Sequence, residues 1–239
     1  MRRSRLDPLL SAVLAFATVV GCSGDSTGPG TASVSLGFST ISAHAALLTA
    51  NGVDTTTITV TPRDANGAPV TLASNAVLIT AKRGSLSSVE QNADGTFAAL
   101  LTASDTAGLD TIVASVNGQR LHRSLLLTFL PGPPSATTSS LGSISPRIVA
   151  DGKSTTDVFV ILRDAQGNIT ANADVTMTTT KGTLSPVVAE PTGPFDYGDD
   201  GHYSATLTST TTVDSAIVSV QVAGQPFGAP IVVQFVLQP

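Results

Sequence analysis

The sequence predicts an all-β protein made of two antiparallel β-sandwiches in tandem, and three observations lead to this fold class. The chain is rich in β-branched and turn-forming residues, with 21 Gly and 14 Pro among 239 residues and only two Glu. This composition disfavours helices and favours strands joined by tight turns. Apolar residues alternate with polar ones along short segments, and the chain repeats itself at a spacing of about one hundred residues, the size of one small domain.

The first residues have the pattern of a secretion signal. Three Arg precede a nearly unbroken run of apolar and small residues at 9–20, which ends at Val20-Gly21-Cys22. This run is shorter than the roughly 20 residues that a membrane-spanning helix needs, but it has the length of a signal core. A signal peptide is therefore predicted over residues 1–21, followed by a flexible tether rich in Ser and Gly over residues 22–31.

The end of this signal resembles the lipobox of bacterial lipoproteins, in which a small residue precedes the cysteine that carries the lipid. The resemblance implies that Cys22, the single Cys of the chain, becomes the first residue of the mature protein and holds it to the membrane through acyl chains. Several acyl chains anchor a protein far more firmly than one chain does. Ser23, at the next position, implies delivery to the outer membrane in that family. The alternative is an ordinary secretion signal beside an unrelated Cys.

The repeat divides the rest of the chain into two copies of one domain. Residues 50–67 and 150–167 share nine identical positions, which include Arg-Asp-Ala-Asn-Gly in the first copy and Arg-Asp-Ala-Gln-Gly in the second. The Asp is suited to an Asx turn and the Gly to a positive φ, so this pentapeptide is predicted to form a corner between strands. The predicted domains span residues 32–130 and 136–239, and a Pro-rich linker at 131–135 joins them.

Alternating residues within each copy predict the strands. At 157–162 the sequence Asp-Val-Phe-Val-Ile-Leu places its Val and Leu residues on one face and the residues between them on the other. Similar segments recur at 203–207 and 218–222, and Asn-Gly, Asp-Gly and Lys-Gly turns bound the alternating segments. Such a pattern is typical of antiparallel strands, and about seven per copy is the number expected of an Ig-like sandwich. One Cys cannot form an internal disulfide, so packing alone must hold each sandwich together.

Together these motifs resemble the bacterial Ig-like domain, group 1, which is the repeat of invasins and intimins. In the second copy they are Ala-Asp-Gly at 150–152, Gly-Thr-Leu-Ser at 182–185, Asp-Gly at 200–201 and Thr-Leu-Thr-Ser at 206–209, and the first copy matches them less closely. The resemblance covers about residues 32–239. It implies an extracytoplasmic β-sandwich that serves as a spacer or as an adhesive module.

Few residues in the chain offer chemistry. None of the three His lies near a nucleophile motif or at a metal-binding spacing, and His202 is interpreted as a surface residue. The formal charge is −5 and no basic stripe exists that could neutralise phosphates, which excludes nucleic acid as a partner. The sequence therefore predicts that the protein is not an enzyme.

The richest carboxylate cluster consists of Asp196, Asp199 and Asp200. Oxygen ligands are those that Ca²⁺ prefers, so Ca²⁺ is the cation that this cluster could hold. The spacing does not fit an EF-type loop, and a solvated loop before a strand is the alternative interpretation. The same three residues form the candidate contact site for a ligand, because loops at the ends of a sandwich vary while the scaffold does not.

We therefore expect a lipid-anchored, non-enzymatic protein of the cell envelope, at the outer membrane and exposed at the cell surface. Its expected role is adhesion or spacing. Its expected partners are the membrane, through the N-terminal lipid, and a protein or a glycan. The alternative is a structural or assembly factor of the envelope that faces the periplasm.

Overall fold

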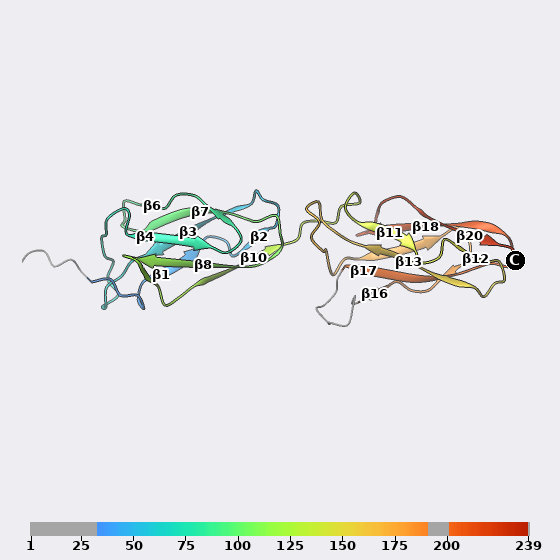
Figure 1. Ribbon diagram of the computed structural model, residues 1–239, viewed down its shortest axis with the longest axis horizontal. Coiled ribbons are helices and arrows are strands. Elements are labelled where there is room, and N and C mark those ends of the chain that lie inside the picture. The colour runs from blue at the N-terminus through green and yellow to red at the C-terminus, as the bar shows by residue number, and fades with distance from the viewer. Residues whose placement is uncertain (1–32, 191–200, 239) are drawn as a thin grey trace, which may run out of the picture. The chain divides into compact units, whose positions relative to one another are not determined.

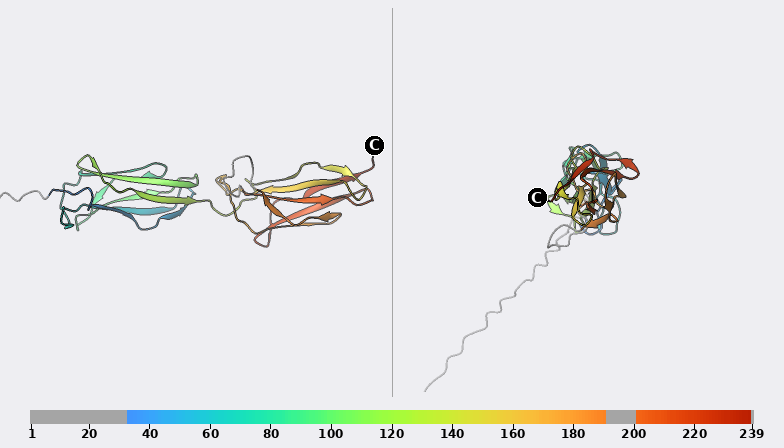
Figure 2. Two further views of the ribbon diagram at one scale, coloured as in Figure 1. Left: turned by 90° about the horizontal axis from the view of Figure 1, so that it is seen from below. Right: turned by 90° about the vertical axis from the view of Figure 1, so that its right-hand side faces the viewer.

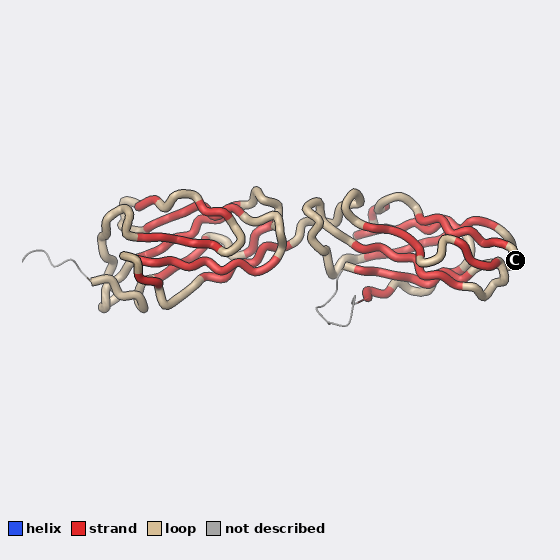
Figure 3. The backbone as a smooth tube through the Cα atoms, in the orientation of Figure 1, coloured by secondary structure: helices blue, strands red, loops and turns tan. Residues whose placement is uncertain are grey.

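The computed structural model describes residues 33–190 and 201–238 of the chain. These residues form strands, turns and loops, as Figure 3 shows, and none of them is in a helix. Consequently no described segment is a helix that could cross a membrane. The prediction of an all-β fold is confirmed. The predicted signal peptide and tether, at 1–21 and 22–31, lie outside the described residues.

The first copy consists of ten strands in two sheets (Figure 1). The strands are β1 (Thr40–Ala43), β2 (Leu47–Thr49), β3 (Thr55–Thr61), β4 (Val77–Ala81), β5 (Ser85–Leu86), β6 (Glu90–Gln91), β7 (Phe97–Thr102), β8 (Gly108–Val116), β9 (Gln119–Arg120) and β10 (Leu125–Leu130). One sheet has the order β1-β3-β7-β5, with β6 also paired to β7. The other has the order β2-β10-β8-β4, with β9 also paired to β8.

The second copy repeats this arrangement strand for strand. Its strands are β11 (Ser140–Ser143), β12 (Arg147–Val149), β13 (Thr155–Ile161), β14 (Val175–Thr179), β15 (Thr183–Leu184), β16 (Val188–Glu190), β17 (His202–Thr208), β18 (Asp214–Val222), β19 (Gln225–Pro226) and β20 (Ile231–Val236). The sheets have the orders β11-β13-β17-β15 and β12-β20-β18-β14, with β16 and β19 as additional partners of β17 and β18. The tandem sandwiches predicted from the repeat are therefore present.

The structure has more strands per copy than the seven or so of an ideal Ig-like sandwich. The first strand of each sandwich is broken in two, so that β1 pairs antiparallel to β3 in one sheet while β2 pairs parallel to β10 in the other. The second copy has the same break between β11 and β12. The other additional strands are only two or three residues long. The sequence predicted antiparallel pairing. Among the described strands, β2–β10 and β12–β20 are the pairs that are parallel instead.

The apolar residues of the alternating segments fill the space between the two sheets of each copy. Val158 and Val160 on β13 are fully buried, whereas Asp157 and Phe159 point outward. Figure 2 shows the strands of each copy in two layers. The largest side chains buried between them include Phe97, Phe129, Leu101 and Leu127 in the first copy and Phe235, Leu162 and Leu207 in the second. Burying each such side chain contributes about 1.5–3 kcal/mol, and this burial replaces the missing disulfide.

The repeated pentapeptide forms the predicted corner. Oδ1 of Asp64 accepts two backbone N–H hydrogen bonds from within the turn, at 2.8 and 2.9 Å. The left-handed residue is the Gly in each copy, with φ of 80° at Gly67 and 87° at Gly167. Because the residue before it has no such requirement, Gln166 can stand where the first copy has Asn66.

Candidate functional site

The site residues predicted from the sequence fall outside the described part of the chain. Cys22 precedes residue 33, and Asp196, Asp199 and Asp200 lie between residues 190 and 201. Lipid attachment and Ca²⁺ binding therefore stay predictions. Within residues 33–190 and 201–238, no group of three or more His, Cys, Asp or Glu is placed to hold a metal ion.

A small pocket lies on the outer face of the β11-β13-β17 sheet in the second copy. Its lining residues are Ile144, Asp157, Phe159, His202 and Ser204, and it encloses about 110 Å³. Sites for drug-sized ligands usually have roughly 300–1,000 Å³. The pocket therefore has room for one side chain or functional group rather than for a whole cofactor.

The register of two neighbouring strands brings the lining residues together. Phe159 on β13 is paired with Ser204 on β17, and Asp157 is paired with Thr206. Because residues two apart in a strand share a face, all of these side chains and that of His202 point to the same side of the sheet. The hydroxyl of Thr206 donates a hydrogen bond to Oδ1 of Asp157 at 2.8 Å, which orients the carboxylate at the edge of the pocket.

The ring of Phe159 contacts both neighbouring strands. Its centroid lies 5.8 Å from that of the His202 imidazole, and the two rings are inclined at 66° in an edge-to-face arrangement. On the other side, Gly142 of β11 is the strand partner of Phe159, and a Cβ at Gly142 would come within 3.2 Å of the ring Cζ. Because Gly142 has no side chain, the Phe159 ring has room to lie over it. The ring is therefore held between β11 and β17.

The structure corrects the interpretation of His202 as an ordinary surface residue. The side chain is half-buried, and its Nδ1 is buried without a hydrogen-bond partner. In the described part of the chain, Thr170 Oγ1 is the other buried polar side-chain atom that has no hydrogen-bond partner. An unpaired buried polar atom costs about 1–3 kcal/mol, so stability does not explain the presence of His202 at this position.

The first copy carries different residues at the equivalent positions. The equivalence follows from the register, since β3 pairs with β7 as β13 pairs with β17. In place of Asp157, Phe159, His202 and Ser204 the first copy has Thr57, Thr59, Thr96 and Ala98. The buried positions between them keep their apolar character in both copies. The side chains of the pocket are therefore a property of the second copy, and the core does not require them.

Two other carboxylates of the second copy have structural roles. Asp164 is fully buried, and its two oxygens accept hydrogen bonds of 2.8–2.9 Å from Asn168, from the N–H of Gly132 and from the N–H of Gln166. Burial raises the pKa of Asp164, but these hydrogen bonds outweigh burial and hold the pKa below its ordinary value. Asp164 thus fastens the predicted linker to its own corner and belongs to no binding site.

Asp151, in the Ala-Asp-Gly motif, organises the turn before β13. Its Oδ1 accepts backbone hydrogen bonds from Ser154 at 2.6 Å and Lys153 at 2.8 Å. These two bonds are the largest causes that lower the pKa of Asp151 to about 2. The carboxylate is therefore ionised at every physiological pH, and the motif is explained by local structure.

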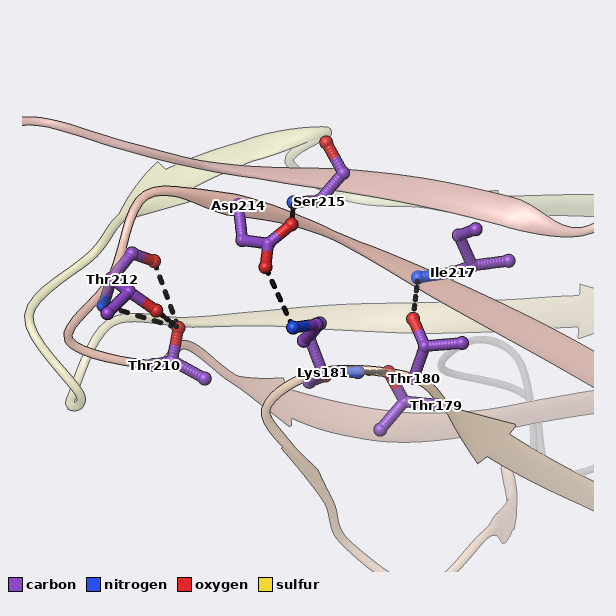
Figure 4. A network of polar contacts seen from close by, with 8 residues as sticks. All are labelled: Thr179, Thr180, Lys181, Thr210, Thr212, Asp214, Ser215 and Ile217. Carbon is purple, nitrogen blue, oxygen red and sulfur yellow. Dashed lines mark hydrogen bonds and ion pairs between the residues drawn. The ribbon is translucent and has the colours of Figure 1, made fainter.

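Polar contacts drawn in Figure 4 join the turn between β14 and β15 to the first residues of β18. Nζ of Lys181 lies 2.9 Å from Oδ2 of Asp214, and the side chains are 51% and 40% exposed. The N–H of Ile217 donates to the hydroxyl of Thr180 at 3.0 Å. The hydrogen bond from Lys181 is the largest of the causes that lower the pKa of Asp214. Exposed ion pairs contribute little stability, so the role of these contacts is to orient the turn against β18.

The first copy has an exposed apolar surface on its β2-β10-β8 face. Leu47 and Leu109 flank Thr128 in the strand register, and both are 62% exposed, so no described residue covers them. Leu126, two positions along β10, is also exposed. The equivalent row of the second copy is polar and consists of Arg147, Gln234 and Ser215. The two copies therefore share one scaffold and present different surfaces.

The sandwiches, their corners and their tandem order define a protein of the bacterial Ig-like class found in invasins and intimins. The chain belongs to the family described as invasin, domain 3, whose model matches residues 35–132 and 135–238 and hence both copies. The resemblance read from the motifs is confirmed.

The solved structures that are similar to the chain include two bacterial proteins of comparable fold. InvD of Yersinia pseudotuberculosis is 29% identical, with a TM-score of 0.62 and 84% of this chain covered. The Escherichia coli adhesin FdeC is 24% identical, with a TM-score of 0.68 and 87% covered. This chain spans 58% of the InvD chain and 66% of the FdeC chain. At 24% identity, the similarity to FdeC supports the fold alone.

Proposed function

We propose that this chain is a lipid-anchored protein of the cell envelope whose two Ig-like modules act in adhesion or as a surface spacer, without catalysis. The observation that carries the proposal is the match of both copies to the invasin domain 3 family. Two copies with one scaffold and different outward-facing residues suit a protein that makes contacts through its surface. The outer membrane, with the modules facing outward, is the proposed location.

The ligand of the proposed adhesin is a protein or a glycan. Loops and sheet faces are the surfaces available to it, because the residues between the sheets are committed to the core. The cluster of Asp196, Asp199 and Asp200 belongs to the proposal as a contact loop that could also hold Ca²⁺. A structural or assembly factor that faces the periplasm is the alternative. It shares the fold and the anchor and differs in the side of the outer membrane on which the modules lie.

Replacing Cys22 by Ala is expected to abolish attachment of fatty acid to the protein. The thiol is the only group at the end of the signal that can form the thioether through which lipoproteins are acylated, and the chain has no second Cys. Cells are grown with an alkyne-labelled fatty acid, and the label on the immunoprecipitated chain is measured.

Ser23→Ala is the matched control, since it changes the neighbouring residue and leaves the thiol in place. We expect full labelling of the wild type and of Ser23→Ala, and none of Cys22→Ala. Equal labelling of the two variants would show that Cys22 is not the anchor.

A further inference from the structure

We propose that the pocket between β13 and β17 binds the side chain of an arginine on a protein partner. The pocket is lined by a carboxylate, an aromatic ring, an imidazole and a hydroxyl, from Asp157, Phe159, His202 and Ser204. The proposal deepens the adhesive role and rests on it for the existence of a partner. The chemistry of the pocket can be tested separately.

Charge is the first reason for choosing a cationic group. Asp157 is exposed and accepts a hydrogen bond from the neutral hydroxyl of Thr206. Within residues 33–190 and 201–238 the ion pair is that of Lys181 with Asp214, so no described Lys or Arg is paired with Asp157. The sequence 191–200, next to the pocket in the chain, contains no Lys or Arg. Residues 136–239 contain nine acidic and four basic residues. An incoming cation therefore meets an unneutralised carboxylate in an acidic domain, and a carboxylate or phosphate would be repelled.

The aromatic ring is the second reason. Phe159 lies two residues from Asp157 on the same face of β13, so a planar cation can lie against the ring while it reaches the carboxylate. Guanidinium groups stack on aromatic rings and bind carboxylates through a fork of N–H donors, whereas the ammonium of Lys is more strongly hydrated. This pair of neighbours favours Arg over Lys.

Size and hydrogen-bonding capacity agree with this choice. A volume of about 110 Å³ holds a guanidinium group with part of its aliphatic stem, and Ile144 supplies an apolar wall for that stem. The carboxylate of Asp157 can only accept hydrogen bonds, and a guanidinium can only donate them.

The three His of the chain provide a direct readout of the pocket. The full chain is labelled with ¹³C-histidine in non-ionic detergent, and the imidazole Cε1–H signals are followed by NMR. The titrant is N-acetyl-arginine amide, and N-acetyl-citrulline amide is the neutral probe of nearly the same shape. We expect a saturable shift of His202, no shift of His44 or His122, and at least tenfold weaker binding of citrulline.

Two variants test the roles of the side chains. Asp157→Asn removes the charge but keeps the shape, and Phe159→Thr introduces the residue that the first copy carries as Thr59. Each is expected to raise the Kd for the arginine probe at least threefold, in line with the modest energies of ion pairs and cation–π contacts. Asp214→Asn, on the opposite sheet, removes the same charge and is expected to leave the Kd unchanged.

Three results would overturn the proposal. These are the absence of a saturable His202 shift, equal shifts with arginine and citrulline, or a stronger response to a neutral methyl pyranoside, which would assign the pocket to a sugar. The titration is independent of membrane location. A negative titration with a surface-exposed protein would therefore refute the arginine pocket alone, and a positive titration with a periplasmic protein would refute the adhesive role alone.

Discussion

Replacing Asp110 by Ala is expected to destabilise the first copy by about 3 kcal/mol or more. Asp110 is fully buried on β8, and its carboxylate accepts three backbone hydrogen bonds from the turn between β4 and β5. Oδ1 accepts from Lys82 at 2.9 Å and Arg83 at 3.1 Å, and Oδ2 accepts from Gly84 at 2.9 Å. Alanine would leave three N–H donors without partners, and each buried unpaired donor costs about 1–3 kcal/mol.

The second copy holds the equivalent turn without a carboxylate. The position equivalent to Asp110 is Ala216, and the turn, Thr180-Lys181-Gly182, has the same length of three residues. There the N–H of Thr180 donates to the carbonyl oxygen of Ile217 at 3.1 Å, and the Thr180 hydroxyl accepts from the N–H of Ile217 at 3.0 Å. The two copies therefore hold a turn of one length in different ways, and in the first copy the buried Asp binds the three N–H groups.

Scanning calorimetry of the full chain measures this effect. For a domain of about one hundred residues, 3 kcal/mol corresponds to a decrease in Tm of roughly 12–24 °C. Asp105→Ala, an exposed Asp in the loop before β8, is the matched control and is expected to change Tm only slightly. If the two variants unfolded at the same temperature, the carboxylate of Asp110 would not be the cap of this turn.

Gly182→Ala is expected to destabilise the second copy by about 2–5 kcal/mol. Gly182 has a φ of 75°, which alone costs a residue with a side chain about 1–2 kcal/mol. A Cβ would also overlap the carbonyl oxygen of Thr208 and come within 3.2 Å of Phe235 Cζ and 3.3 Å of Leu207 Cδ1. Overpacking of a core adds about 1–3 kcal/mol. The glycine of the Gly-Thr-Leu-Ser motif is therefore required both for its φ and for its lack of a side chain.

Gly167→Ala separates these two causes. Gly167 has a similar φ of 87°, and no atom lies within 4 Å of the place where its Cβ would be. Only the conformational cost applies there, so we expect a loss of about 1–2 kcal/mol. Urea unfolding of both variants gives the comparison. Equal losses would show that the contacts of Gly182 with Thr208 and Phe235 do not matter.

The regular part of the fold could be predicted because its signals are local. The alternation at 157–162 and the corner Gly67 depend on residues close to one another in sequence, and the structure has them as predicted. The break between β1 and β2 could not be predicted, because it depends on which sheet each half pairs with. The role of Asp110 was also hidden, since its partners lie 26–28 residues away.

The pocket was missed for a different reason. Asp157 and Phe159 are outward-facing residues of an alternating strand, and in a single strand such residues have no evident purpose. The signal lies in the comparison of the two copies, where Thr57 and Thr59 stand at the same register as Asp157 and Phe159. A comparison of the outward-facing residues of the two copies would have found this pair, because two Thr on one face are replaced by an acidic and an aromatic residue.

The most direct test of the central claim is protease treatment of intact cells, followed by immunoblotting of the chain before and after the outer membrane is opened. Because the proposed location places both Ig-like modules on the outer side of the outer membrane, we predict that the wild type is cleaved on intact cells while a periplasmic marker is protected. If the chain is protected on intact cells and cleaved only after the outer membrane is opened, the modules face the periplasm. The adhesive role would then be wrong, and the structural or assembly role would replace it.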